Sequence, residues 1–185
     1  MTMKYLIIIL FTCYKFYGQT DSTAVDHFLQ RVEDNNNKLI TTKYPNFYLK
    51  NDKGVITNEK LIGKITFINV WTEFCAPCIA EMNSLNTLYE KHKDNKKFAF
   101  ISLTSDDENM IKSATKQYNI KYNIYNVTRK EIYKLNLNNG FPTSTIVDAQ
   151  GKIHYIKIGG SSDPIKANEM VLKEFGPIID SLLKN

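Results

Sequence analysis

Two cysteines with two residues between them, Cys75 and Cys78, follow directly on a strongly apolar segment, and this junction constrains the fold more than any other feature. The segment 65–71 is almost entirely β-branched or aromatic, which predicts a strand buried on both faces of a sheet. Apolar residues then recur at helical spacing over 79–89, and 98–103 predicts a second strand. The chain therefore contains a strand-helix-strand unit, with an expected right-handed crossover, and the cysteines lie where the first strand passes into the helix.

This position has chemical consequences for the cysteines. A thiolate, not a thiol, attacks a disulfide, so a reactive cysteine needs a lowered pKa and access to solvent. Free N–H groups and the positive end of the helix dipole favour the ionised form of Cys75, and Pro77 suits a first turn that needs no N–H from it. Cys78 is one turn further in and more shielded. We therefore predict that Cys75 attacks a substrate disulfide and that Cys78 resolves the mixed disulfide.

The rest of the chain carries signals for further strands and helices. Two hairpins are predicted, from 47–49 and 55–57 about a turn at 51–54, and from 143–147 and 153–158 about a turn at 148–151. Ser105-x-x-Glu108 and Thr128-x-x-Glu131 match the capping box and predict two helix starts, with a candidate strand at 122–127 between them. Asp163-Pro164 predicts the start of a last helix, which Gly176-Pro177 should interrupt or bend.

The N-terminus has the layout of a secretory signal peptide, with Lys4, an apolar run and a polar end near Gly18. The apolar run is about ten residues long, and a spanning helix needs roughly 20, so we expect no stable membrane span once the signal is cleaved. A retained anchor and a lipid on Cys13 are the alternatives. We divide the chain of 185 residues into a signal peptide (1–18), a linker or leading helix (19–43) and one domain (44–185).

Charge and cysteine count argue against several classes of function. The formal charge of +5 is spread along the chain, which argues against a nucleic-acid partner. Removal of the signal would take Cys13 with it, and the remaining pair closes too small a loop to stabilise a fold. Half of a zinc site is the alternative for the pair, but zinc needs four ligands and the three histidines are scattered. We expect redox chemistry at the pair, with no cofactor and no metal.

Two stretches resemble a known family. They are Phe67-Ile-Asn-Val-Trp-Thr-Glu-Phe-Cys-Ala-Pro-Cys-Ile-Ala-Glu-Met82 and Gly140-Phe-Pro-Thr-Ser-Thr-Ile-Val-Asp-Ala-Gln-Gly151. The first resembles the active-site stretch of thioredoxin-fold proteins of the TlpA/ResA type, and the second resembles their cis-proline loop and following hairpin. The likeness covers residue 44 to the C-terminus.

The resemblance implies an α/β thioredoxin fold: a central mixed sheet flanked by helices, with an N-terminal β-hairpin and an inserted helix and strand. It also implies a periplasmic or otherwise extracytoplasmic thiol–disulfide oxidoreductase. Such proteins usually reduce their partners, often apocytochrome c or other exported proteins with disulfides. Their electrons would come from a membrane-bound donor.

The resemblance further assigns roles to single residues. Pro142 would be the cis proline beside the cysteines that binds an extended substrate, although an X-Pro bond is cis only about 5–6% of the time. Phe141, Trp71 and Phe74 are candidate substrate contacts, and simple packing is the alternative for Trp71.

Glu81 matches an acidic residue that the family places beside its cysteines. It lies three residues after Cys78, on the same helix face, and a buried carboxyl group there could move the proton that Cys78 must lose. Ordinary thioredoxins have a buried Asp where this chain has Asn69, which leaves Glu81 as the nearest proton carrier in the sequence. A solvated surface glutamate is the alternative.

Two departures from the family leave the direction of electron flow open. Phe74 stands where the family usually has a Trp before the first cysteine, and Ala76 stands at the variable position between the cysteines. Residues between two such cysteines influence the reduction potential of the pair. Two other functions are alternatives. A peroxiredoxin-like peroxidase is suggested by Thr72-x-x-Cys75 but lacks the upstream Pro, and a Cu(I) chaperone would want a third ligand.

Overall fold

The computed structural model describes residues 22–184, and the chain divides into two compact units, 1–38 and 39–185. In the first unit it describes helix α2 (Ser22–Leu39), within the segment for which the sequence predicts a linker or leading helix. The predicted signal peptide, with Cys13, lies outside the described residues. No helix within 22–184 is both long enough and apolar enough to cross a bilayer.

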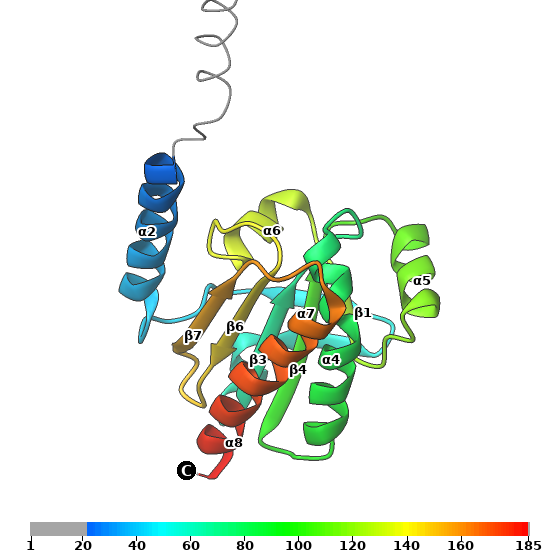
Figure 1. Cartoon of the computed structure of the whole chain (residues 1–185). Helices are drawn as coiled ribbons and strands as arrows, with labels where there is room; N and C mark the ends of the chain where they lie inside the picture. The colour runs from blue at the N-terminus through cyan, green and yellow to red at the C-terminus, as the bar shows by residue number, and fades with distance from the viewer. Residues whose placement is uncertain (1–21, 185) are drawn as a thin grey trace, which may run out of the picture. The chain divides into compact units, whose positions relative to one another are not determined.

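A five-stranded mixed sheet forms the centre of the second unit, in the order β5, β4, β3, β6, β7 (Figure 1). Its strands are β3 (Ile65–Val70), β4 (Phe98–Thr104), β5 (Ile124–Asn126), β6 (Thr143–Val147) and β7 (Ile153–Ile158). Strands β3, β4 and β5 run parallel, whereas β6 is antiparallel to both β3 and β7. This is the predicted mixed sheet, and the second predicted hairpin is confirmed as β6–β7.

The remaining elements surround this sheet. They are β1 (Tyr48–Asn51), β2 (Gly54–Thr57), α3 (Asn58–Leu61), α4 (Ala76–His92), α5 (Glu108–Gln117), α6 (Arg129–Leu135), α7 (Pro164–Met170), the π-helix η1 (Val171–Phe175) and α8 (Gly176–Lys184). Helix α4 joins β3 to β4, and the run α7–η1–α8 lies beside it on the same face of the sheet (Figure 1). The antiparallel pair β1–β2 is the predicted N-terminal hairpin, and α5 with β5 is the predicted insertion.

Strand β3 separates two hydrophobic clusters. Successive side chains of a strand point to opposite faces, so Ile65, Phe67 and Trp71 join one cluster and Ile68 and Val70 join the other. The first cluster lies under α4 and the C-terminal helices, and the second lies under the β1–β2 hairpin and α6. Every residue of β3 is buried, as predicted for a strand covered on both faces.

Two helix starts test the capping-box prediction. Thr128 forms a complete capping box with Glu131 at the start of α6, which confirms the prediction there. The prediction at Ser105 is wrong, because α5 begins at Glu108 and its N-cap is Asp107. The Asp107 carboxylate accepts from the N–H groups two and three residues further on, so it already supplies the cap that Ser105 was expected to supply.

The α-helical hydrogen-bonding pattern of the C-terminal run is interrupted just before Gly176, as predicted. The π-helical stretch η1 directly precedes Gly176 and Pro177. Proline has no N–H to donate, and its ring crowds the carbonyl group four residues back, so a wider turn relieves both problems. The helix therefore continues to Lys184 instead of ending.

Candidate active site

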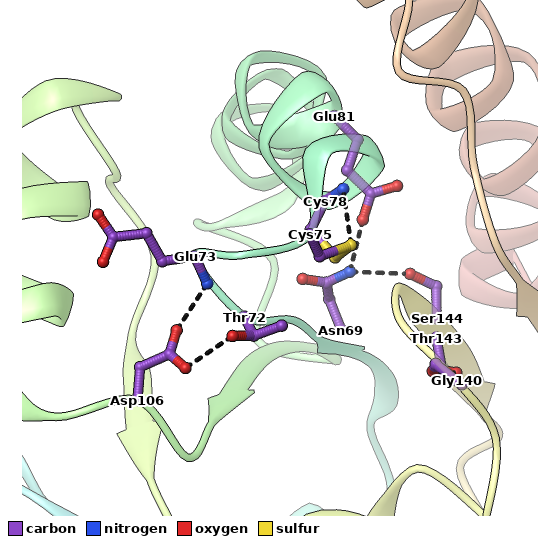
Figure 2. The surroundings of a disulfide bond; sticks show 10 residues. All are labelled: Asn69, Thr72, Glu73, Cys75, Cys78, Glu81, Asp106, Gly140, Thr143 and Ser144. Atoms are coloured by element: carbon purple, nitrogen blue, oxygen red, sulfur yellow. Dashed lines mark hydrogen bonds between the residues drawn. A yellow bond between two sulfur atoms is a disulfide. The ribbon is translucent and has the colours of Figure 1, made fainter.

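The two cysteines form a disulfide at the N-terminus of α4 (Figure 2). Cys75 is the N-cap, and its Sγ accepts a hydrogen bond of 3.2 Å from the N–H of Cys78. Pro77 lies in the first turn, as predicted. Once the disulfide is reduced, the free N–H groups and dipole of the 17-residue helix would stabilise a thiolate on Cys75.

The two cysteines differ in their access to solvent. Cys78 is 1% exposed and belongs to the first hydrophobic cluster together with Met82 and Leu85. Cys75 is half-buried and lies at the edge of that cluster. A sulfur atom of a partner protein can therefore reach Cys75 more readily than Cys78.

Glu81 is buried beside this pair, with 2% of its surface exposed. The alternative of a solvated surface glutamate is therefore wrong. Asn69 on β3 donates a hydrogen bond of 2.9 Å from Nδ2 to Glu81 Oε1. Burial raises the pKa of Glu81 to about 8, and the hydrogen bond from Asn69 opposes that rise. A carboxyl group with this pKa can exchange a proton with a thiol near neutral pH.

Asn69 also connects Glu81 to the strand that follows the proline loop. Its Nδ2 donates a second hydrogen bond, of 3.1 Å, to the Oγ atom of Ser144 on β6. Figure 2 shows the side chains of Asn69, Glu81 and Ser144 meeting beside the disulfide. Carboxyl, amide and hydroxyl groups thus form a buried polar chain at the redox pair.

The peptide bond between Phe141 and Pro142 is cis, as predicted. Pro142 is buried, and its carbonyl group accepts a hydrogen bond of 2.8 Å from the N–H of Gly159. A methyl group on Gly160 would lie 3.5 Å from both Pro142 Cγ and Pro77 Cβ. The proline loop and the cysteine turn therefore approach each other across Gly160.

The aromatic candidates occupy three different environments. Trp71 is 1% exposed and donates its indole N–H to Ser102 Oγ at 2.8 Å, so it packs in the core and does not line a surface groove. Phe74 is 80% exposed, next to Cys75. Phe141 is half-buried and packs against both hydrophobic clusters. Of these three aromatic side chains, only Phe74 and Phe141 therefore have surface that a partner could reach.

The sequence did not indicate Asp106, which follows β4. Its carboxylate accepts one hydrogen bond from Thr72 Oγ1 and one from the Glu73 N–H, each of 2.7 Å. Thr72 and Glu73 belong to the loop that leads into Cys75, more than 30 residues earlier in the chain. No local sequence pattern connects residues so far apart.

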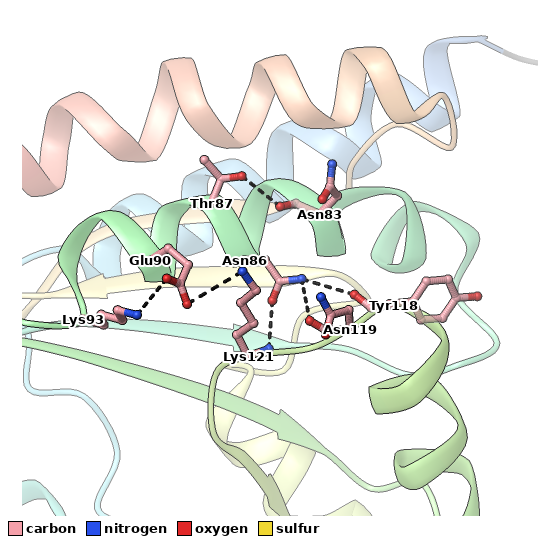
Figure 3. Close-up of polar contacts among 8 residues, drawn as sticks. All are labelled: Asn83, Asn86, Thr87, Glu90, Lys93, Tyr118, Asn119 and Lys121. Carbon is pink, nitrogen blue, oxygen red and sulfur yellow. Dashed lines mark hydrogen bonds and ion pairs between the residues drawn. The ribbon is translucent and has the colours of Figure 1, made fainter.

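A second polar cluster joins α4 to the segment that follows α5 (Figure 3). Asn86 donates to the carbonyl groups of Tyr118 and Asn119 at 3.2 and 3.1 Å and accepts from the Lys121 N–H at 2.9 Å. The cluster fixes the inserted segment after α5 to α4. Across residues 22–184, no group of three or more His, Cys, Asp or Glu side chains is placed to hold a metal ion.

Comparison with known proteins identifies the family. The model of the Redoxin family matches residues 39–172. The chain belongs to the Redoxin family. This redoxin is 31% identical to the thiol-disulfide oxidoreductase ResA of Bacillus cereus (strain ZK / E33L) over 150 residues, which cover 80% of this chain and 82% of that protein.

Solved structures share the fold of this redoxin. A thiol:disulfide interchange protein of the thioredoxin family from Chlorobium tepidum TLS superposes with a TM-score of 0.61, at 21% identity over 77% of this chain and 97% of that chain. A thiol-disulfide oxidoreductase from Bacteroides fragilis NCTC 9343 gives 0.56, at 24% identity over 70% and 99%. The ResA-type resemblance and the thioredoxin fold are confirmed. The redoxin is a protein thiol–disulfide oxidoreductase.

Proposed function

We propose that this redoxin reduces disulfide bonds of exported proteins, with Cys75 as the nucleophile and Cys78 as the resolving thiol. The observation that carries this proposal is the contrast within the pair. Cys75 is accessible at a helix N-terminus, whereas Cys78 is 1% exposed and lies one helical turn from a buried acid, Glu81. An accessible thiolate suits attack on a partner, and a shielded thiol beside a proton carrier suits the second step.

The reaction exchanges two sulfur–sulfur bonds. The Cys75 thiolate attacks one sulfur of the substrate disulfide, so that a Cys75–substrate bond forms, the substrate bond breaks, and the released sulfur takes up a proton. Cys78 then loses its proton and attacks the Sγ of Cys75. The Cys75–Cys78 disulfide forms, and the second substrate sulfur leaves as a thiol. Two electrons pass to the substrate, and an electron donor must restore the dithiol.

Glu81 would accept the proton of Cys78 in the second step. Only the ionised carboxylate can do so, and burial holds its pKa at about 8. The resolving step should therefore accelerate as the pH rises through about 8.

A substrate would bind along the cysteine turn and the proline loop. Phe74 offers exposed apolar surface next to Cys75. Pro142 has no N–H, and its carbonyl group already bonds to Gly159, so main-chain pairing with an extended substrate falls to the neighbouring Phe141. Phe74, Phe141 and Pro142 are thus the proposed substrate contacts.

The proposed location is extracytoplasmic, supported by the signal-like segment 1–18 and by the similarity to ResA. Disulfide substrates occur in such oxidising compartments. The proposed partners are exported proteins with disulfides, with apocytochrome c as one candidate, and a membrane-bound electron donor.

Serine variants test the order of the two cysteines. Cys75→Ser should abolish reduction of protein disulfides, whereas Cys78→Ser should accumulate mixed disulfides that are visible on non-reducing gels. Comparable activity in both variants would contradict the proposal. The same would follow if Cys75→Ser, not Cys78→Ser, trapped the mixed disulfide.

The reduction potential tests the direction of electron flow. Equilibration of the Cys75–Cys78 pair in a defined thiol–disulfide buffer should give a value near or below about −250 mV, in the range of reductants. A value near about −120 mV would instead mark the redoxin as an oxidant that donates disulfides.

A further inference from the structure

Asp106 holds the segment that leads into Cys75. Its carboxylate accepts a hydrogen bond from Thr72 Oγ1 and another from the Glu73 N–H, both of 2.7 Å (Figure 2). Hydrogen bonds to a carboxylate are shorter and stronger than those between neutral groups. The two bonds therefore restrain a backbone atom and a side chain of this segment together.

The segment is a turn closed by the nucleophilic cysteine. The N–H of Cys75 donates to the carbonyl oxygen of Thr72 at 3.1 Å, so Thr72 and Cys75 are the ends of the turn, with Glu73 and Phe74 between them. Asp106 bonds the first and second residues of the turn. The third residue is Phe74 and the fourth is Cys75, so both take their positions from the half that Asp106 restrains.

Asp106 is itself fixed by the ends of two strands. Its N–H donates to Thr104 Oγ1, at the end of β4, at 3.2 Å. Its carbonyl group accepts a hydrogen bond from the side chain of Asn126, at the end of β5. The carboxylate therefore projects from the ends of β4 and β5 and links them to the cysteine turn.

Phe74 is the side chain that this arrangement presents to solvent. At 80% exposure, it is the most exposed of the large hydrophobic side chains within the described part of the chain. An aromatic ring so exposed contributes little to folding, but its burial against a partner would be favourable. Because Phe74 directly precedes Cys75, such a partner must place apolar surface beside the sulfur that Cys75 attacks.

We propose that Asp106 is a positioning residue for substrate docking. It holds the turn so that Phe74 and the Cys75 sulfur meet a polypeptide together, and the favoured substrate carries an apolar side chain next to its disulfide. This inference rests on the proposed function and adds a substrate preference to it.

Two disulfide-linked peptides test the proposal, identical except for Leu or Ser next to the cysteine. The wild-type redoxin should reduce the Leu peptide with a kcat/KM about tenfold higher than the Ser peptide, mostly through KM. Asp106→Ala and Phe74→Ala should each remove most of this preference. The rate of each variant with the small disulfide 5,5′-dithiobis(2-nitrobenzoate), which carries no peptide side chain, is measured in parallel, and the loss of preference should exceed any change in this rate.

Matched variants separate positioning from general damage. Asp107→Ala removes the same charge and also two hydrogen bonds, but these bonds come from the first turn of α5 and not from the cysteine turn, so the variant should keep the preference. Asp106→Asn, whose Oδ1 can still accept from Glu73, should recover most of it. Thr72→Val removes one of the two bonds, leaves Asp106 in place, and should weaken the preference partially, which covers the case that Asp106→Ala does not fold.

The proposal is overturned if Asp106→Ala keeps the wild-type preference, or if it slows both peptides and the small disulfide equally. It is also overturned if the active wild-type protein shows no preference between the peptides. Failure of the proposed function looks different, because the wild-type redoxin would then reduce neither peptide faster than Cys75→Ser does.

Discussion

The Nδ2 atom of Asn69 lies 2.9 Å from Oε1 of Glu81, and both side chains are buried beside the redox pair. The amide donates a hydrogen bond to the carboxyl group and so favours its ionised form, while burial favours the neutral form. The acid strength of Glu81, on α4, is therefore adjusted by a residue on β3.

Replacing Glu81 by Gln should slow the resolving step, because Cys78 loses its proton acceptor. We expect a loss of up to about a hundredfold and a flatter pH dependence near pH 8. Stopped-flow absorbance can follow the second release of thionitrobenzoate after the reduced protein reacts with 5,5′-dithiobis(2-nitrobenzoate). Glu90→Gln, on the outer side of the same helix, is the control and should behave as wild type. A wild-type second phase in Glu81→Gln would exclude Glu81 as the proton acceptor.

Replacing Asn69 by Leu should raise the pKa of Glu81 further. The substitution removes the hydrogen bond that stabilises the carboxylate and keeps the burial that disfavours it. The pH at which the resolving step reaches half its maximum rate should move upward from the wild-type value. A downward or absent shift would mean that Asn69 does not control this acid.

Protein stability should fall as the pH rises between about 4.5 and 8, through Glu81. Its pKa is raised from 4.5 in the unfolded chain to about 8 in the fold, so the folded state binds more protons across this window. Urea denaturation gives the free energy of unfolding of the oxidised wild type and of oxidised Glu81→Gln at several pH values. The difference between the two proteins at each pH isolates Glu81, because the other titrating groups are common to both. The advantage of Glu81→Gln over wild type should grow with pH. A difference independent of pH would contradict the raised pKa.

The two capping motifs should differ in their contribution to stability. Thr128→Ala removes an intact capping box and should lower the free energy of unfolding by about 1 kcal/mol. Ser105→Ala removes a hydroxyl group that does not cap α5 and should cost less than about 0.5 kcal/mol. Chemical denaturation of both variants measures the contrast, and equal losses would show that Ser105 contributes to the start of α5 after all.

The parts of the site that the sequence predicted depend on local signals. The run before Cys75 has the composition of a fully buried strand, and a helix accepts Pro77 without disruption only in its first turn, so the strand-to-helix junction follows from adjacent residues. The loop at Pro142 was found through its resemblance to a family. The start of α5 was misplaced because Ser105 and Asp107 are both good N-caps, and a local rule does not choose between them.

The parts that the sequence missed depend on contacts between distant segments. Asp106 bonds to Thr72 and Glu73 across the top of two parallel strands, and no window of sequence contains both partners. Asn69 and Glu81 were both singled out in the sequence, yet their hydrogen bond depends on how α4 packs over β3. Trp71 had two possible roles, and its burial decided for packing.

Because side chains alternate between the two faces of β3, the polar groups of the site depend on the register in which β3 pairs with its neighbours. Asn69 lies opposite Ser102 in β4 and Ser144 in β6, on the face that carries Glu81. A slip of one residue would turn Asn69 to the other face and bring an aliphatic neighbour to the acid, leaving two buried polar groups without partners. The hydrogen bond between the Asn69 amide and the Glu81 carboxyl group would thus favour the correct register of β3, in addition to the role in proton transfer that we propose for Glu81.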